Sequence, residues 1–235
     1  MTGDTLSERM AAAARELQVQ HDPAATMKSA VALLVQNVEG CDAAGISIVH
    51  AKRRVETDAA TGDMAVTGDR LQYELGEGPC LDAIWQQEAV YASDLATDPR
   101  WPTWARRVIE ETGVRSMFCL RLFTIENTLG GLNMYSRHVD GFSPEDRAEG
   151  QALAAHIAIA VVAARASEQF AAALDSRTII AQAVGMMMER YQIDAARAFA
   201  LLTRLSSVQN VKLRDLAAEI VSTDHLSASP GTSDA

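Results

Sequence analysis

The feature that most constrains the fold is a long segment without helix-breaking residues. Between Pro144 and Arg190 there is no further proline, and glycine occurs only at positions 150 and 185. Because proline breaks helices and glycine weakens them, we favour one continuous helix over two helices that fray near residues 164–168. A stripe of apolar and small residues at spacings of four and three is typical of a coiled-coil stalk. Its members are Leu153, Ile157, Ala160, Ala164, Ser167, Ala171 and Leu174.

The segment Leu174–Ile220 reads as three helical patterns with short breaks between them. We predict that Asp194 is the N-cap of the second helix. The third helix is expected after Ser206–Asn210. Three short helices bury only a small core, so a partner or an upstream anchor is expected. The apolar face of the third helix would comprise Leu213, Leu216, Ala217 and Ile220.

Charge is unevenly distributed along the chain. Residues 165–222 carry seven Lys and Arg against six Asp and Glu, a net charge of +1, whereas residues 1–164 carry −9. A nearly neutral segment on an acidic chain is where we expect a polyanionic partner. Solvated helix faces with neighbouring carboxylates explain the same cations, and the charge pattern alone favours that ordinary interpretation.

A series of short motifs runs through the C-terminal segment. Its members are Gln182-Ala-Val-Gly185, Met188-Glu-Arg190, Ala198-Phe199, Leu202, Ser206, Asn210, Lys212-Leu-Arg-Asp215 and Ala217. The ordered series resembles the ANTAR domain, an RNA-binding antitermination module of bacterial regulators. Thr203 stands where that family usually has arginine, and Arg204 follows it.

The ANTAR resemblance implies binding to paired hairpins in nascent mRNA, and two hairpins suit a homodimer formed through the helical stalk. Cations would engage phosphates while polar groups read splayed loop bases. Arg197 ranks low as a contact because Asp194 is close in sequence. The residues expected to contact RNA are Arg177, Arg190, Arg204, Asn210, Lys212 and Arg214.

Upstream of the long helix the sequence alternates strand and helix patterns. A Thr5-x-x-Glu8 capping box predicts a helix through Val19, and Asp22-Pro23 begins a second helix that ends at Gly40. Turns are expected at residues 61–63 and 67–69. This order predicts an α+β fold with helices flanking an antiparallel sheet. The expected strands are Ala43–His50, Arg53–Asp58, Leu71–Leu75, Ala89–Ser93, Ser116–Phe123 and Leu129–Tyr135, and the expected helices between them are Cys80–Gln87 and Trp104–Thr112.

Several motifs in this upstream region recur together. They are Leu75-Gly-Glu-Gly-Pro-Cys-Leu81, Ser93-Asp94-Leu95, Asp98-Pro-Arg-Trp101, Gly113-Val-Arg-Ser116 and Leu129-Gly-Gly-Leu-Asn-Met134, followed by Phe142 and Asp146. They resemble the GAF domain, a small-molecule sensing fold whose members bind cyclic nucleotides, tetrapyrroles, other small molecules or no known ligand. We therefore expect a sensor with a small-molecule effector and identify no cofactor.

We divide the chain into a helix at 1–22, a GAF-like sensor domain at 23–164, an ANTAR-like domain at 165–222 and a disordered tail at 223–235. The N-terminus lacks the order of a signal peptide, and no apolar run is judged long enough to span a membrane. The three cysteines, Cys41, Cys80 and Cys119, have no CxxC spacing. These features predict a cytoplasmic protein with reduced thiols.

Aromatic residues are the candidate ligand contacts of the sensor. Plain core packing is the commoner role of such side chains. Trp104 and Phe123 belong to a wider set of aromatic residues that could line a cavity between the helices and the sheet. The candidates are Trp85, Trp101, Phe118 and Tyr135.

Little in the sequence indicates catalysis or metal binding. Cys80 at a helix start could be a redox sensor, but a buried small side chain is commoner. Residues 76–79 (GEGP) are expected to shape a turn rather than cradle a ligand. No nucleophile–base constellation or metal-ligand spacing is evident. The five histidines are scattered, at positions 21, 50, 138, 156 and 225.

Together these patterns predict a cytoplasmic transcription antitermination regulator that binds hairpin RNA under control of a sensor, and no enzyme activity. The alternative is a ligand-sensing dimer that signals to a protein partner without nucleic acid. Its support is the acidic net charge and Thr203. DNA binding by the helices is the weakest of the three interpretations, because no recognition helix or basic arm is evident.

Overall fold

The chain consists of two compact units, residues 1–166 and 167–235. The computed structural model describes residues 6–19, 22–123 and 128–227. Thr5 of the predicted capping box therefore lies outside the described residues.

The N-terminal unit contains one five-stranded antiparallel sheet in the order β2-β1-β5-β4-β3. Strand β1 is fully buried from Ala43 to Ile48, as expected for a strand covered on both faces. The predicted antiparallel α+β fold is confirmed. The strands are β1 (Ala43–Val49), β2 (Val55–Ala60), β3 (Ala89–Ala92), β4 (Ser116–Phe123) and β5 (Thr128–Ser136).

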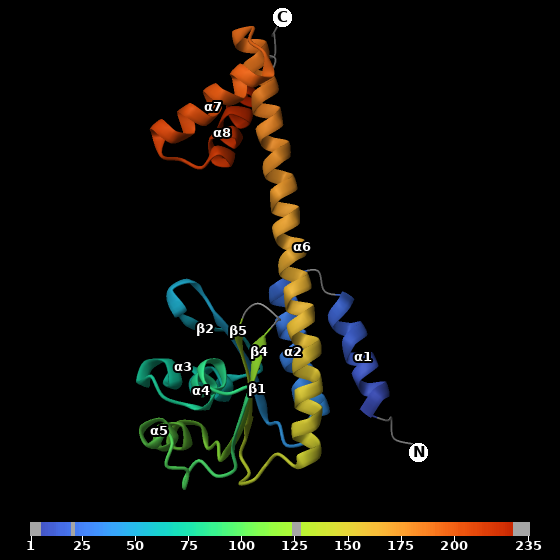
Figure 1. Ribbon diagram of the computed structural model, residues 1–235, viewed down its shortest axis with the longest axis vertical. Coiled ribbons are helices and arrows are strands. Elements are labelled where there is room, and N and C mark those ends of the chain that lie inside the picture. Colours follow the sequence, from blue (N-terminus) through green and yellow to red (C-terminus); the bar gives the residue numbers. More distant parts are fainter. Residues whose placement is uncertain (1–5, 20–21, 124–127, 228–235) are drawn as a thin grey trace, which may run out of the picture. The chain divides into compact units, whose positions relative to one another are not determined.

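Helices cover both faces of this sheet (Figure 1). On one side lie α3 (Asp63–Leu75), α4 (Pro79–Trp85) and α5 (Pro102–Thr112), and on the other α2 (Pro23–Asn37) and the first part of α6 (Pro144–Tyr191). The apolar core is correspondingly split into two clusters, one on each face. A short 3₁₀ turn, η1 (Ala51–Arg53), joins β1 to β2.

The N-terminal helix α1 (Leu6–Val19) packs on the outer side of this unit. Ala13 and Leu17 are buried in the core cluster on the α2 face. Arg9 forms an ion pair of 3.0 Å with Glu149 on α6. The helix is therefore held by both apolar packing and one ion pair.

The prediction of a strand at Leu71–Leu75 is wrong, because these residues form the end of α3. The predicted turn at residues 67–69 is wrong for the same reason. Leu71 and Leu75 are four apart, so they fit one face of a helix as well as alternate positions of a strand. Helix α3 also turns polar side chains inward: Asp69 and Gln72 are both buried. That burial breaks the usual amphipathic pattern.

The preference for one continuous helix after Pro144 is confirmed, since α6 extends for 48 residues. Its start is a reciprocal cap. Asp146 N donates to Ser143 Oγ at 3.0 Å, and Ser143 N donates to an Asp146 carboxylate oxygen at 2.9 Å. Because α6 crosses the boundary between the two units, helical hydrogen bonds rather than a loop connect them.

The expectation that no segment is apolar enough to span a membrane needs correction. Among the described residues, α6 alone passes that test by length and composition. The alanines and branched residues responsible also form a packing face, since Leu153, Ile157 and Val161 are fully buried in the N-terminal unit. A core helix has the same composition, so the result is weak evidence of a membrane span.

The C-terminal unit is a bundle of the end of α6 with α7 (Ala195–Gln209) and α8 (Leu213–Ser227). The predicted N-cap is confirmed, since Asp194 accepts a hydrogen bond of 2.8 Å from Arg197 N. Helix α7 continues through most of the predicted break and ends at Asn210, which has a left-handed conformation with φ of 54°. The small core of the bundle comprises Ala183, Met187, Ala198, Leu202, Leu216 and Ala217.

The predicted disordered tail begins too early. Residues 223–227 belong to α8, because the helical hydrogen bonding that starts at Leu213 continues through Ser227. The remainder of the predicted tail, 228–235, lies outside the described residues.

The burial of α7 can be tested with two adjacent leucines. Leu202 is fully buried, whereas Leu201 is 37% exposed. Leu202→Ala should destabilise the bundle by about 2–5 kcal/mol because it leaves a cavity. Leu201→Ala, the matched control, should cost about 0.5 kcal/mol or less. Amide hydrogen exchange of α7 and α8 measures both, and equal effects would contradict the placement of α7.

Candidate functional site

Six buried or half-buried side chains form a hydrogen-bonded polar cluster in the N-terminal unit, here called the Asp69 cluster. Asp69 lies at its centre and is fully buried. Asn133 donates to Asp69 at 2.7 Å, Thr57 donates to its other oxygen at 2.9 Å, and the Tyr135 hydroxyl also donates to it. The members are Ser47, Thr57, Asp69, Tyr73, Asn133 and Tyr135.

The members of this cluster come from several elements of the fold. Ser47 on β1 accepts hydrogen bonds from Tyr73 on α3 at 2.6 Å and from Asn133 on β5 at 2.9 Å. A side chain at Gly45 would approach the Asp69 carboxylate to 2.7 Å, so glycine is needed there. The cluster therefore ties α3 to three strands through polar contacts in the interior.

Burial dominates the electrostatics of the Asp69 cluster. Desolvation raises the pKa of Asp69 to about 6, and the hydrogen bonds from Tyr135, Thr57 and Asn133 only partly offset that rise. Thr57, Asn133 and Tyr135 are all neutral donors. Asp69 is consequently a carboxyl group that changes protonation close to neutral pH.

Sequence reasoning missed the Asp69 cluster, although a signal was present. Ser47 and Asn133 are polar residues inside otherwise apolar strands. A buried polar side chain requires a hydrogen-bond partner, so each implied a second polar group nearby. The turn predicted at residues 67–69 does not place Asp69 in the core, so the sequence did not identify it as that partner.

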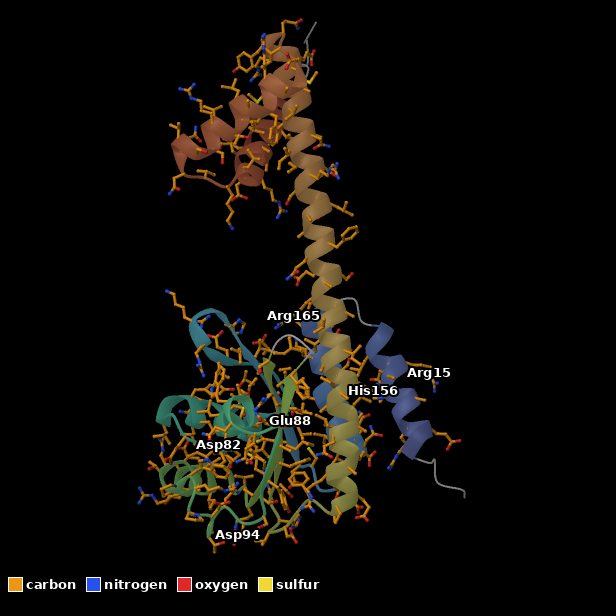
Figure 2. All side chains as sticks on the ribbon, viewed as in Figure 1. Arg15, Asp82, Glu88, Asp94, His156 and Arg165 are labelled. Atoms are coloured by element: carbon orange, nitrogen blue, oxygen red, sulfur yellow. The ribbon has the colours of Figure 1, made fainter. Side chains whose placement is uncertain are left out.

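Strand β2 connects this cluster to α6 within the N-terminal unit. Thr57 contacts Asp69, and the next residue, Asp58, lies 3.9 Å from Arg165 on α6. Asp58 also lies 3.3 Å from a ring nitrogen of His50. Figure 2 labels Arg165 on α6. Consecutive residues of one strand thus reach the buried cluster and the helix that continues to the second unit.

Cys80 is a buried thiol beside the cluster. It is fully buried, and burial raises its pKa to about 12. Its Sγ donates to Ser47 Oγ at 3.4 Å. The protonated thiol favours the interpretation as a packed small side chain over a redox sensor, which would need an exposed thiolate.

The glycine-rich segment after α3 forms a tight turn. Gly76 is the C-cap of α3 in the left-handed conformation, and Gly78 is the N-cap of α4 with φ of 144°. A side chain at Gly78 would collide with Gln72, whose Oε1 accepts a hydrogen bond from Cys80 N at 2.7 Å. The expectation of a turn is confirmed.

The four candidate aromatic contacts do not come together. Trp101 and Tyr135 lie in the core cluster on the α3–α5 face, whereas Phe118 lies in the cluster on the α2 face. Trp85 is 37% exposed, with the guanidinium of Arg53 4.1 Å from its ring centre. Trp101 Nε1 donates to an Asp82 carboxylate oxygen at 2.9 Å.

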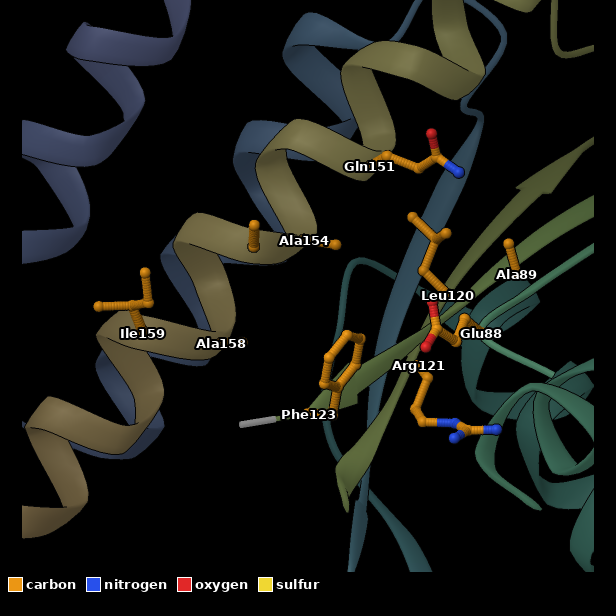
Figure 3. Close-up of a pocket in the computed structure, with 10 residues that line it drawn as sticks. Glu88, Ala89, Leu120, Arg121, Phe123, Gln151, Ala154, Ala158 and Ile159 are labelled. Carbon is orange, nitrogen blue, oxygen red and sulfur yellow. The ribbon is translucent and has the colours of Figure 1, made fainter. Parts of the chain in front are cut away.

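A groove of about 640 Å³ lies elsewhere in this unit, between α6 and the β3–β4 edge of the sheet. Figure 3 shows lining side chains that come from α6 on one side and from β4 on the other. Phe123, from the wider aromatic set, lines it and is 48% exposed. The lining is mostly alanine, leucine and phenylalanine, with Glu88 and Arg121 as charged members. We call this the α6–β4 groove.

The predicted RNA contacts are surface residues of the C-terminal unit. Arg177 and Arg190 lie on α6 and Arg204 on α7, and all three are exposed. Lys212 and Arg214 lie at the start of α8, where Lys212 O accepts hydrogen bonds from the amides of Asp215 and Leu216. Asn210 is the left-handed C-cap of α7.

Two of these cations have no carboxylate partner in the part of the chain that the structure describes. Lys212 and Arg214 form no ion pair there within 4.0 Å, whereas Arg197 lies 3.6 Å from Asp194. The low rank of Arg197 agrees with this contact. The α7–α8 turn therefore presents two cations on a surface that also carries the N-terminal end of α8, where the helix dipole favours anions.

No metal site is evident in the described ranges, where no three His, Cys, Asp or Glu side chains gather as ligands. His156 is exposed on α6.

The α6–β4 groove lies in an α+β domain, and the cations of the α7–α8 turn lie in a helical domain that follows it. This arrangement suits a sensor domain followed by an output domain. The GAF domain profile matches residues 20–162, and the ANTAR domain profile matches residues 168–221. The chain belongs to the GAF domain family and carries a C-terminal ANTAR domain. Both are regulatory rather than catalytic domain types. This is the architecture of a regulator with a sensor and an RNA-binding output domain.

Solved structures show the same sensor fold. The GAF domain of a phosphoenolpyruvate-protein phosphotransferase from Coxiella burnetii aligns with a TM-score of 0.57 at 18% identity, covering 70% of this chain and 96% of that one. The free methionine-R-sulfoxide reductase from Neisseria meningitidis aligns with a TM-score of 0.56 at 18% identity, covering 69% and 91%. At these identities the likeness concerns the fold alone. No curated protein matches the chain.

The buried carboxyl group makes the stability of the N-terminal unit depend on pH. Because the folded pKa of Asp69 is about 6 and its ordinary value is 3.8, the folded state binds the proton more tightly. The contribution of this proton to the free energy of unfolding is complete below pH 4. It is lost as the pH rises through 6, which lowers the free energy of unfolding by about 3 kcal/mol. Asp69→Asn should remove this part of the dependence of the free energy of unfolding on pH. Chemical denaturation at pH 4 to 7 measures it, and parallel curves for both proteins would refute the shift.

Proposed function

We propose that this protein is a transcription antitermination regulator that binds hairpin RNA through its ANTAR domain under control of its GAF domain. The observation that carries the proposal is the ANTAR match at residues 168–221 together with the cations of the α7–α8 turn. RNA binding suppresses a terminator when it holds the transcript in a competing hairpin structure.

Electrostatics support the turn as the phosphate contact. Lys212 and Arg214 are exposed and have no carboxylate within ion-pair distance among the described residues. Arg177, Arg190 and Arg204 extend the proposed interface along α6 and α7. Cations of this kind attract the phosphate backbone without reading sequence, which positions the RNA.

Sequence reading needs polar groups that reach unpaired bases, because the major groove of A-form RNA is too deep and narrow for side chains. Asn210 suits that role. Its backbone is fixed by hydrogen bonds from its amide to Ser206 O and Ser207 O, and its side chain is exposed. An amide side chain both donates and accepts hydrogen bonds, as base edges require.

A homodimer formed through α6 fits both the RNA and the helix. The middle of α6 exposes Phe170 by 67% and Leu174 by 48%, and residues 166–175 are exposed throughout. An isolated helix with large apolar side chains in water gains stability by pairing with a second copy. Two copies would present two RNA-binding domains to two neighbouring hairpins.

We propose that a small-molecule effector acts on the GAF domain. The α6–β4 groove suits such a ligand. It fits an amphipathic molecule, since apolar side chains line it and Glu88 and Arg121 are its charged members. On the other face, Trp101 and Tyr135 are buried in the core, so they would contact only a ligand that displaces core side chains between the helices and the sheet. We identify no cofactor.

The compartment and chemistry follow from the same assignment. A regulator of nascent transcripts acts in the cytoplasm of a bacterium, and the three buried, unpaired cysteines Cys41, Cys80 and Cys119 suit a reducing compartment. Both domain types are regulatory, so we propose no enzyme activity.

A ligand-sensing dimer that contacts a protein partner without RNA is the competing function. Exposed apolar side chains on α7 favour it, since Phe199 is 47% exposed and Val208 76% exposed. Purified protein that shifts no hairpin RNA at low salt would support this alternative.

Charge reversal at the turn tests RNA binding. The double variant Lys212→Glu, Arg214→Glu should lower affinity for hairpin RNA about tenfold or more and reduce the slope of log affinity against log salt by about 1.5. The matched control, Arg197→Glu, removes a cation that already faces Asp194 and should change both values less. Fluorescence anisotropy over a salt series measures them. Unchanged affinity at every salt concentration would show that the interface lies elsewhere.

A lysine on the exposed apolar stripe tests the dimer. Leu174→Lys should convert the dimer to monomer, because two charges would meet across the helix pair. Gln169→Lys adds the same charge at an exposed position outside the predicted stripe and should remain dimeric. Sedimentation equilibrium distinguishes these states, and a monomeric wild-type chain would exclude the proposed dimer.

A further inference from the structure

A second groove, of about 270 Å³, lies within the C-terminal unit where α6, α7 and α8 meet. We call it the three-helix groove. Met187 and Leu216 contribute apolar lining, and Arg190 and Tyr191 line it from the end of α6. Gln209 and Glu219 add polar side chains from the other two helices.

We propose that the three-helix groove binds one unpaired base from the loop of the RNA hairpin. This inference rests on the proposed RNA binding and identifies the element that would read sequence. It adds Tyr191, Gln209 and Glu219 to the interface.

The size of the groove favours a single base over larger partners. Its volume is just below the range of about 300–1,000 Å³ typical of sites for drug-sized molecules. An α-helix with its side chains is about 10–12 Å across and needs a longer trough. Loop bases splay outward, so a single base can enter a space that a duplex cannot.

The lining of the groove matches the two surfaces of a base. Tyr191 is 57% exposed, so its ring is available for stacking against a flat base. Met187, whose thioether is polarizable, also lines the groove. A base held between an aromatic ring and apolar side chains loses contact with water on both faces.

The polar side chains of the groove match the base edge. Glu219 only accepts hydrogen bonds when ionised, whereas the Gln209 amide both donates and accepts. A carboxylate accepts hydrogen bonds from N–H groups of the base edge, and an exocyclic amino group offers two of them whereas uracil offers only its single N3–H, so the carboxylate favours a base with an amino group. Adenine, cytosine and guanine carry that amino group.

The groove is continuous in sequence with the proposed phosphate contacts. Gln209 lines the groove, and the next residue is Asn210, whose left-handed conformation turns the chain toward Lys212. Arg190 supplies a further cation at the groove itself. A nucleotide with its base in the groove thus has cations nearby for its flanking phosphates.

The test uses the full chain and a hairpin RNA selected by that chain from a pool with a fixed stem and a randomised loop. 2-Aminopurine, a fluorescent base with an amino group, replaces each loop position in turn. Tyr191→Leu should lower affinity at least about fivefold, the loss expected for one stacked base, without changing the salt slope. Tyr191→Phe keeps the ring and should bind like the wild type.

Control variants separate stacking from unfolding. Phe199→Leu removes an exposed aromatic side chain of the same unit that does not line the groove, and it should bind normally. Gln209→Ala changes the groove from a different helix and should also weaken binding. Circular dichroism melting of each variant verifies the fold.

One loop position should lose its 2-aminopurine fluorescence on binding to the wild type and to Tyr191→Phe, but keep it with Tyr191→Leu. Selected loops should also contain an amino-bearing base at that position. If Tyr191→Leu binds the hairpin with wild-type affinity, or if Phe199→Leu loses as much affinity, the inference that the groove binds a base is wrong, while the proposed RNA binding stands. If the chain selects no hairpin at all, the proposed function fails and the groove inference with it.

Discussion

The structure depends on one uninterrupted helix. Helix α6 packs its first part against the sheet of the GAF domain and provides the first helix of the ANTAR bundle with its last part. Its buried face changes along the way, from Leu153 and Ile157 in one core to Ala183 and Met187 in the other. Two short helices and the end of α6 bury only a small core, so attachment to a helix anchored in a larger domain is expected to stabilise the bundle.

The Asp69 cluster gives the sensor domain its unusual interior. Burying a carboxyl group among neutral donors costs free energy that an apolar residue would not. In return, the cluster joins α3 to β1, β2 and β5 through specific hydrogen bonds. Strand β2 links it onward, because Thr57 contacts the cluster and Asp58 lies near Arg165 of α6. Consecutive residues of β2 therefore contact the cluster and the helix shared with the output domain.

The sequence predicted most of the fold because its main signals are local. Proline and glycine spacing defined α6, and the Asp194 cap defined α7. The strand predicted at Leu71–Leu75 failed because a five-residue apolar alternation fits both periods, and only the tertiary contacts of Asp69 decide between them. Neither groove was predicted, since each is formed by residues distant in sequence. The predicted RNA contacts are exposed residues of the C-terminal unit. Tyr191 was not among them, because only the packing of three helices places it at a groove.

The most direct test of the account is to sequence the RNA that is crosslinked to the full chain in its host cells, alongside a chain that ends at Ala166. The account predicts that the full chain enriches transcripts with neighbouring hairpins close to terminators, and that the shorter chain, which lacks α7 and α8, enriches none. Equal RNA profiles from the two chains, or no RNA from either, would contradict an RNA-binding output and leave a sensor domain that signals through another partner.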